Sequence, residues 1–125
     1  MILGLGTDII EVERIKKAVC SKRFKDNVFT EIEQAYCQSR GKNSAASYAA
    51  RFAAKEAFFK ALGTGIVTHL TEVEVINDEK DAPKIFLHGK ALTLAQDKGA
   101  GDIFLTLSHS RDFATAVCIL TARQS

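Results

Sequence analysis

The first half of the sequence alternates between a strand pattern and helical patterns. Residues 2–10 are rich in Ile, Leu and Gly and predict a buried strand. Apolar residues at helical spacing predict helices at residues 11–19 and 30–39. The longest predicted helix covers residues 43–62 and is rich in alanine. It should end at Gly63, because glycine readily adopts the left-handed conformation of a helix C-terminus.

The second half predicts an antiparallel arrangement. Its expected elements are strands at 72–76 and 84–87, a helix at 89–98, and strands at 103–107 and 113–120. The last two strands flank polar residues at 108–112, which predicts a hairpin with polar groups at its turn. Both faces of the last strand are apolar, so helices or another subunit should cover each face. This order of elements favours an α+β fold over a doubly wound sheet.

Composition narrows the class of protein further. The 125 residues are 46% apolar and 26% charged and contain no linker-like tract, so one compact domain over residues 1–125 is expected. Seventeen basic and fifteen acidic residues give a net charge of +2, which argues against general binding to nucleic acid or to a membrane surface. Residues 1–10 do not resemble a signal peptide, and no apolar run is long enough to span a bilayer. We therefore expect a cytoplasmic protein.

The cysteines argue against a disulfide framework. Cys20, Cys37 and Cys118 are odd in number and form no C-x-x-C pair. Reduced thiols are therefore expected, and a structural zinc site is not.

A carboxylate within the first strand is the first sign of chemistry. Asp8 is expected to share a strand face with Ile2, Gly4, Gly6 and Ile10, where the two glycines leave room for a close approach to the backbone. An unpaired buried aspartate is costly unless it binds a cation or a partner. The structural alternative is that Asp8 caps the helix that follows the strand.

A second carboxylate lies within an aromatic stripe of the longest helix. Glu56 follows Phe52 by four residues and precedes Phe59 by three, and Lys60 comes one turn later. The structural alternative is a simple ion pair between Glu56 and Lys60. With Asp8, however, Glu56 supplies two oxygen donors from separate elements, which predicts a partial Mg²⁺ site completed by water and substrate phosphate. Such a site fits the transfer of a phosphoryl-type group.

Other polar residues fit an anionic substrate. Arg51 and Lys55 flank Glu56 on the same helix and are expected either to contact phosphate or to be solvated. Ser108, His109 and Ser110 end a strand and begin a turn, where side chains and turn amides can bind an anion. No acidic partner near them supports a Ser-His-Asp triad.

Positive charge is concentrated near the N-terminus. Six basic residues without an acid occur within twelve positions: Arg14, Lys16, Lys17, Lys22, Arg23 and Lys25. They form either a solvated helix face or a docking surface for an acidic protein, to which Val19 and Phe24 would add apolar contact. One aromatic residue offers little stacking surface, so nucleic acid is disfavoured.

Three segments resemble a known family. Residues 6–15 (GTDIIEVERI), 51–65 (RFAAKEAFFKALGTG) and 107–110 (LSHS) are similar to the three motifs of the holo-[acyl-carrier-protein] synthase family. The resemblance covers essentially the whole chain. It implies the 4′-phosphopantetheinyl transferase fold, with an antiparallel sheet packed by a long central helix. It also implies transfer of 4′-phosphopantetheine from coenzyme A to a serine of apo acyl carrier protein, in support of fatty acid biosynthesis, with release of adenosine 3′,5′-bisphosphate.

The resemblance also implies roles for individual residues. Asp8, Glu56 and Lys60 become catalytic, with Asp8 and Glu56 as magnesium ligands and Lys60 as a phosphate contact. The implied contacts with coenzyme A are Arg51, Lys60, Gly63, Gly65, Ser108 and His109. The implied docking residues for the carrier protein are Arg14, Lys17, Lys22, Arg23 and Phe24. The family usually has glycine where Asp81 stands, so the turn before Pro83 is expected to differ.

Assembly and mechanism follow from the same resemblance. The family forms homotrimers with sites between subunits, in agreement with the doubly apolar last strand. The serine of the carrier would attack the β-phosphoryl group of coenzyme A, and Glu56 is a candidate to accept its proton. Two rival functions remain: another magnesium-dependent enzyme acting on a nucleotide diphosphate, and a basic adaptor domain in which Asp8 and Glu56 form structural ion pairs.

Overall fold

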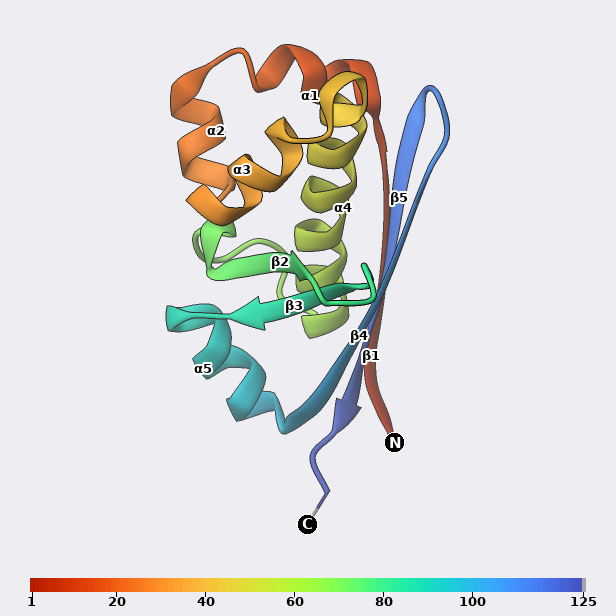
Figure 1. Ribbon diagram of the computed structural model, residues 1–125. Coiled ribbons are helices and arrows are strands. Elements are labelled where there is room, and N and C mark those ends of the chain that lie inside the picture. Colours follow the sequence, from red (N-terminus) through yellow and green to blue (C-terminus); the bar gives the residue numbers. More distant parts are fainter. Residues whose placement is uncertain (125) are drawn as a thin grey trace.

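The computed structural model describes residues 1–124 and forms an α+β fold with ten main elements (Figure 1). In chain order these are β1 (Ile2–Glu11), α1 (Val12–Ala18), α2 (Lys22–Val28), α3 (Glu31–Gln38), α4 (Ser44–Leu62), β2 (Val73–Asn77), β3 (Pro83–Leu87), α5 (Gly89–Lys98), β4 (Ala100–His109) and β5 (Phe113–Ala122). Short 3₁₀ turns precede α4 and β2.

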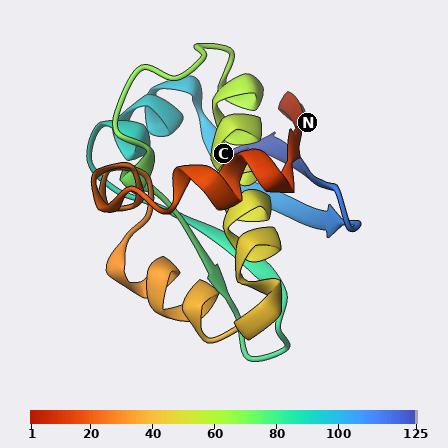
Figure 2. The ribbon, with the colours of Figure 1, turned by 90° about the horizontal axis from the view of Figure 1, so that it is seen from above.

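The strands form two antiparallel sheets. The larger sheet has the order β1-β5-β4, and β2 pairs with β3 in a separate two-stranded sheet. Helix α4 packs on one face of the larger sheet, and α2 and α3 lie on the side of α4 away from that sheet (Figure 1). Viewed from above, α1 crosses α4 (Figure 2). The predicted antiparallel sheet packed by a long central helix is therefore confirmed.

Two glycines allow β1 and α4 to approach closely. A Cβ atom on Gly4 would overlap the carbonyl oxygen of Ala61, and one on Gly6 would overlap that of Ala57. The prediction that something approaches the backbone at these glycines is confirmed, and it is helix α4. Ile2 does not share this face, because the strand register shifts between Ile2 and Gly4 and leaves Ile2 exposed.

Helix α4 is buried on nearly all sides. It ends at Gly63, whose φ of +87° confirms the predicted left-handed cap. Its alanines include several with no exposed surface, which lets the sheet and the other helices pack against its backbone. Between residues 48 and 62, the residues that keep exposed surface are Phe52, Glu56 and Lys60. Their spacing of four residues gives one narrow accessible stripe along α4.

Helix α2 was not predicted. Its only large apolar side chains are Phe24 and Val28, too few for a periodic pattern. Ser21 is its N-cap, and the Ser21 side chain accepts a hydrogen bond from the amide of Phe24. The basic segment is therefore distributed over two short helices. The other predicted elements are confirmed within a few residues at each end, and β4 is longer than expected.

No helix of residues 1–124 covers one face of the larger sheet (Figure 1). We call it the outer sheet face, and its members are Leu5, Thr7, Ile9, Phe104, Thr106, Ser108, Thr115, Val117 and Ile119. Leu5 is 64% exposed, Ile9 63% and Phe104 56%. Helices thus cover one of the two apolar faces of β5 and leave the other open.

Among residues 1–124, no helix combines the length and the apolar composition needed to cross a membrane.

Candidate active site

Asp8 has one carboxylate oxygen without a partner. Its Oδ1 accepts a hydrogen bond from Lys60 Nζ at 3.0 Å, and Lys60 also donates to the carbonyl oxygen of Thr7 at 3.0 Å. Its Oδ2 is buried and has no hydrogen-bond partner among residues 1–124. The alternative in which Asp8 caps α1 is wrong, because Glu11 is the N-cap residue and no side chain caps it. A buried carboxylate oxygen of this kind is satisfied by a cation, a water molecule or a donor from a ligand.

Glu56 lies next to Asp8 on the accessible stripe of α4. Burial and the Asp8 carboxylate raise the pKa of Glu56, and the positive charges of Lys60 and Arg14 oppose part of that rise. The predicted structural pair between Glu56 and Lys60 is not among the ion pairs of residues 1–124, since Lys60 turns to β1 instead. Two carboxylates therefore lie beside one ammonium group, which is paired with Asp8 alone.

The donor set fits a magnesium ion that shares its coordination with a ligand. Within residues 1–124, no group of three or more His, Cys, Asp or Glu side chains could hold a metal ion. Asp8 and Glu56 would therefore supply two oxygen donors, and water or phosphate oxygens the remainder. Mg²⁺ prefers such a site, because it binds oxygen and usually keeps several waters. The unpartnered Oδ2 of Asp8 is consistent with that use.

Arg51 belongs to a different cleft. Its side chain is almost fully buried, donates from Nη2 to Asn77 Oδ1 at 2.8 Å and from Nη1 to Ser47 Oγ at 3.3 Å, and lies over the ring of Tyr36. Its Nε is buried without a partner, and no ion pair of Arg51 occurs among the described residues. Arg51 is thus not solvated, and its uncompensated charge suits an anionic ligand.

Arg51 and His109 line the same cleft of about 390 Å³, together with Tyr36, Asn77 and Asp81. Sequence reasoning did not find Tyr36 or Asn77, because they lie on α3 and β2, far from Arg51 in the chain. A second cleft of about 950 Å³ lies between the start of α4 and the β4–β5 turn. His109 lines it too, together with basic residues that sequence reasoning also missed, Lys42 and Arg111.

The predicted coenzyme A residues do not form one site within the chain. Arg51 and Lys60 are nine residues apart on α4, which places them about 14 Å apart along the axis and on opposite sides of the helix. Gly63 and Gly65 follow Lys60 and both have positive φ, in the corner after α4. Ser108 lies on the outer sheet face and does not line the cleft of Arg51, although its chain neighbours Leu107 and His109 do.

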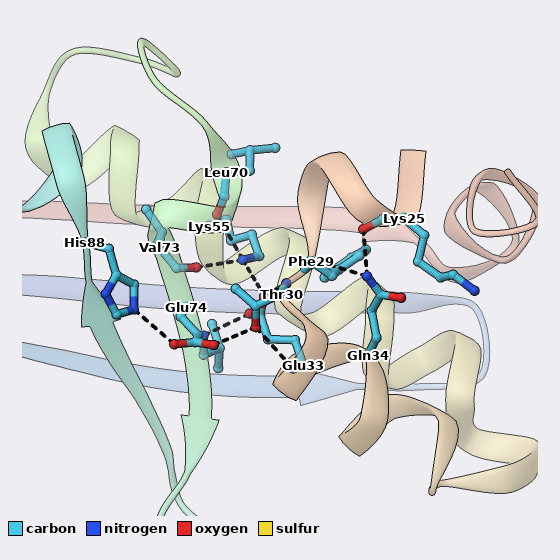
Figure 3. A network of polar contacts seen from close by, with 11 residues as sticks. Lys25, Phe29, Thr30, Glu33, Gln34, Lys55, Leu70, Val73, Glu74 and His88 are labelled. Carbon is cyan, nitrogen blue, oxygen red and sulfur yellow. Dashed lines mark hydrogen bonds and ion pairs between the residues drawn. The ribbon is translucent and has the colours of Figure 1, made fainter. Parts of the chain in front are cut away.

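Lys55 is neither solvated nor free to contact phosphate, so both expectations for it are wrong. It is fully buried and donates to Glu33 Oε1 at 2.8 Å, to the Val73 carbonyl at 2.7 Å and to the Leu70 carbonyl at 3.0 Å (Figure 3). Burial lowers the pKa of Lys55, and Glu33 opposes that shift. Glu33 also accepts from the amide of Val75. This network ties α3, α4 and β2 together, so Lys55 is a structural residue.

The predicted docking residues lie on α1 and α2. Arg14, Lys17, Lys22 and Arg23 are exposed, and Lys22 forms an ion pair with Asp26 at 2.5 Å. Phe24 is half-buried, with its ring centroid 6.1 Å from that of Phe52 and 6.4 Å from that of Phe29. Phe52 precedes Glu56 by one turn, so the basic surface adjoins the accessible stripe of α4 that carries Glu56 and Lys60.

Comparison with known proteins defines the class to which this site belongs. Residues 4–118 match the model of the 4′-phosphopantetheinyl transferase superfamily. The chain therefore belongs to the 4′-phosphopantetheinyl transferase superfamily.

Its full-length relatives are holo-[acyl-carrier-protein] synthases. The synthase of Ruminiclostridium cellulolyticum is 44% identical over 129 residues, which cover 100% of this chain and 96% of that protein. The synthase of Alkaliphilus metalliredigens is 45% identical over 123 residues, covering 97% and 100%. A crystal structure of the Bacillus anthracis synthase in complex with CoA (3′,5′-ADP) is 34% identical, has a TM-score of 0.82, and covers 98% of this chain and 99% of that one. The resemblance inferred from three motifs is thereby confirmed.

Proposed function

We propose that this protein transfers 4′-phosphopantetheine from coenzyme A to a serine hydroxyl of apo acyl carrier protein, releasing adenosine 3′,5′-bisphosphate, in support of fatty acid biosynthesis in the cytoplasm. The observation that carries the proposal is the buried, unpartnered Oδ2 of Asp8, beside Glu56 and Lys60. Two carboxylates with one ammonium group can bind a cation and, through it, a diphosphate. Relatives of the same length are named for this reaction.

Magnesium is the metal that we propose for Asp8 and Glu56. When bound, it would supply charge neutralisation for the diphosphate during phosphoryl transfer. The Lys60 ammonium group lies 3.0 Å from Asp8 and is half exposed, so it can contact a phosphate oxygen while it holds the carboxylate in place.

The residues around the reacting groups have separable roles. Glu56 is proposed to accept the proton of the attacking serine, because it is a carboxylate on the accessible stripe of α4, where the serine can approach it. Lys60 would offset the negative charge that develops on the departing phosphate. Arg51 and His109 line a separate cleft with an unpaired positive charge, which is suited to another phosphate of coenzyme A.

A homotrimer with sites between subunits is proposed as the active assembly. Two observations support an assembly of this kind. The outer sheet face exposes Leu5, Ile9 and Phe104, an apolar surface that another subunit would cover. Arg51 and Lys60 also lie on opposite sides of α4. One ligand can therefore contact an Arg51 and a Lys60 more readily when the two residues come from different subunits.

The basic surface of α1 and α2 is proposed to dock the carrier protein. Its exposed Arg14, Lys17 and Arg23 suit an acidic partner, and the half-buried Phe24 adds an apolar edge. This surface adjoins Glu56, whose pKa responds to the charge of Arg14. A carrier bound here would present its serine close to the carboxylates.

The intact mass of apo acyl carrier protein, measured after incubation with this protein and coenzyme A, tests the proposal. A mass gain equal to one phosphopantetheine is expected with Mg²⁺ and not with excess EDTA. Breakdown of coenzyme A without any carrier would favour the rival enzyme. A folded protein that binds acidic proteins equally well with and without Mg²⁺, and leaves a modifiable carrier unchanged, would favour the adaptor domain.

A further inference from the structure

The turn between β2 and β3 contains an aspartate in a conformation that favours glycine. Asp81 has a φ of +64° and is the one non-glycine residue with positive φ among residues 1–124. Glycine adopts this conformation at lower cost than any other residue. The backbone of the turn therefore keeps a glycine-like shape although the side chain is present. The side-chain contacts of Asp81 must therefore offset the cost of this backbone conformation.

The Asp81 side chain orients a neighbouring amide. Its Oδ1 accepts a hydrogen bond from Asn77 Nδ2 at 2.9 Å, and the hydroxyl of Tyr36 lies 3.0 Å from the same nitrogen. A carboxylate only accepts hydrogen bonds, so Asp81 requires the NH₂ group of Asn77 to face it. The oxygen of Asn77 is thereby turned to Arg51, whose Nη2 donates to it at 2.8 Å.

This chain of contacts ends on the unpaired guanidinium group. Arg51 lies over the Tyr36 ring, with 4.1 Å from Cζ to the ring centroid, and Asn77 and Ser47 hold its two terminal nitrogens. Its Nε is buried and finds no partner in the described part of the chain. Asp81 lines the same cleft but acts on Arg51 through the neutral Asn77, so the positive charge is not cancelled by a direct ion pair.

We infer that Asp81 is a positioning residue, which orients Arg51 through Asn77 for a phosphate group of coenzyme A. This inference rests on the proposed function. A guanidinium group that is already oriented loses less conformational freedom when the ligand binds, so the effect should fall on ligand affinity. The chemical step at Asp8 and Glu56 should be little affected, because Arg51 faces a different side of α4.

Three variants test this role. Asp81→Gly removes the carboxylate and suits the backbone conformation, whereas Asp81→Asn keeps an acceptor oxygen and tolerates positive φ. Glu79→Gln is the matched control, because Glu79 is an exposed carboxylate of the same turn with no hydrogen bond to Asn77. The Kd of coenzyme A is measured by calorimetry, kcat and KM by transfer to the carrier, and Tm by thermal unfolding.

Asp81→Gly should raise the Kd and KM for coenzyme A about fivefold, the order expected for one lost hydrogen bond, with kcat within about twofold and no fall in Tm. Asp81→Asn and Glu79→Gln should stay within about twofold of the wild-type Kd. The inference is overturned if Asp81→Gly binds as tightly as wild type, if Asp81→Asn is equally impaired, or if Glu79→Gln gives the same loss. A wild-type protein that binds no coenzyme A would overturn the proposed function as well.

Discussion

Lys60 turns away from Glu56, one turn earlier in the same helix, and binds Asp8 of β1 at 3.0 Å. This cross-element ion pair leaves Glu56 without its helical partner and occupies one oxygen of Asp8. The second oxygen of Asp8 remains buried and unpartnered. The contact between α4 and β1 therefore leaves an excess of negative charge at a partly buried position, and this excess supports the proposed binding of a cation there.

The carboxylates should be needed for turnover and not for folding. Asp8→Asn and Glu56→Gln are each expected to lower the rate of carrier modification at least about 100-fold, because each removes charge from the reacting centre. The Tm of both variants should stay close to that of wild type. Asp97→Asn, at an exposed position of α5, is the matched control and should retain full activity. Near-normal turnover in Glu56→Gln would remove Glu56 from the mechanism.

The glycine contact between β1 and α4 should not tolerate a methyl group. Gly6→Ala is expected to destabilise the protein by about 3 kcal/mol, because the new Cβ would overlap the carbonyl oxygen of Ala57. Urea unfolding measures this loss. Gln96→Ala, at an exposed position of α5, should change stability by less than about 0.5 kcal/mol. Equal stability of the two variants would contradict the close packing described above.

Charge reversal on the basic surface should weaken carrier binding selectively. Lys17→Glu and Arg23→Glu are expected to raise the Kd for acyl carrier protein about tenfold or more and to leave the Kd of coenzyme A nearly unchanged. Arg14 is not used, because its charge acts on Glu56. Lys90→Glu on α5 makes the same charge change on another helix and should have little effect. If the affinities for acyl carrier protein and for coenzyme A fell equally, the variants would be misfolded and the docking surface would not be tested by them.

Sites shared between subunits should allow two inactive variants to complement each other. Glu56→Gln and His109→Ala, unfolded and refolded together, are expected to recover activity that neither regains alone. Adding Leu5→Asp to both should abolish the recovery, because it places a charge on the outer sheet face. Light scattering reports the assembly state in each case. A mixture no more active than the sum of its parts would show that each chain carries a complete site.

The free energy of unfolding should fall at alkaline pH because of a buried thiol. Burial raises the pKa of Cys118 from 9.0 to about 12. Above pH 9 the unfolded chain loses this proton while the folded chain keeps it, so stability falls as pH rises from 9 towards 12, by about 1.4 kcal/mol per pH unit.

Urea unfolding between pH 8 and 10.5 measures the slope that Cys118 contributes. Cys118→Ala should show a shallower slope than wild type, although it is less stable overall. Only Cys20 should react with a thiol reagent in the folded protein, since Cys37 and Cys118 are buried. Identical slopes for Cys118→Ala and wild type would show that Cys118 does not cause the loss of stability at alkaline pH.

Local sequence patterns predicted most of the fold and half of the site. The periodicity of residues 43–62, the glycine at position 63 and the hairpin around residues 108–112 all depend on interactions between near neighbours, and they are confirmed. Asp8 and Glu56 were singled out because a carboxylate is out of place among apolar neighbours. The structure brings the two carboxylates together, and their roles stay predictions. Helix α2 was missed, because seven residues with few apolar positions carry too little periodic signal.

By itself the sequence determined the elements, the family motifs and the identity of the two carboxylates, because these depend on residue type and spacing. Only the tertiary structure decided which charges meet. Lys60 pairs with Asp8, 52 residues away, and not with Glu56. Lys55 is buried against Glu33, and Arg51 is held by Asn77. Whether a lysine or arginine is solvated, structural or free for a ligand depends on which distant elements pack around it, and spacing along one helix does not contain that information.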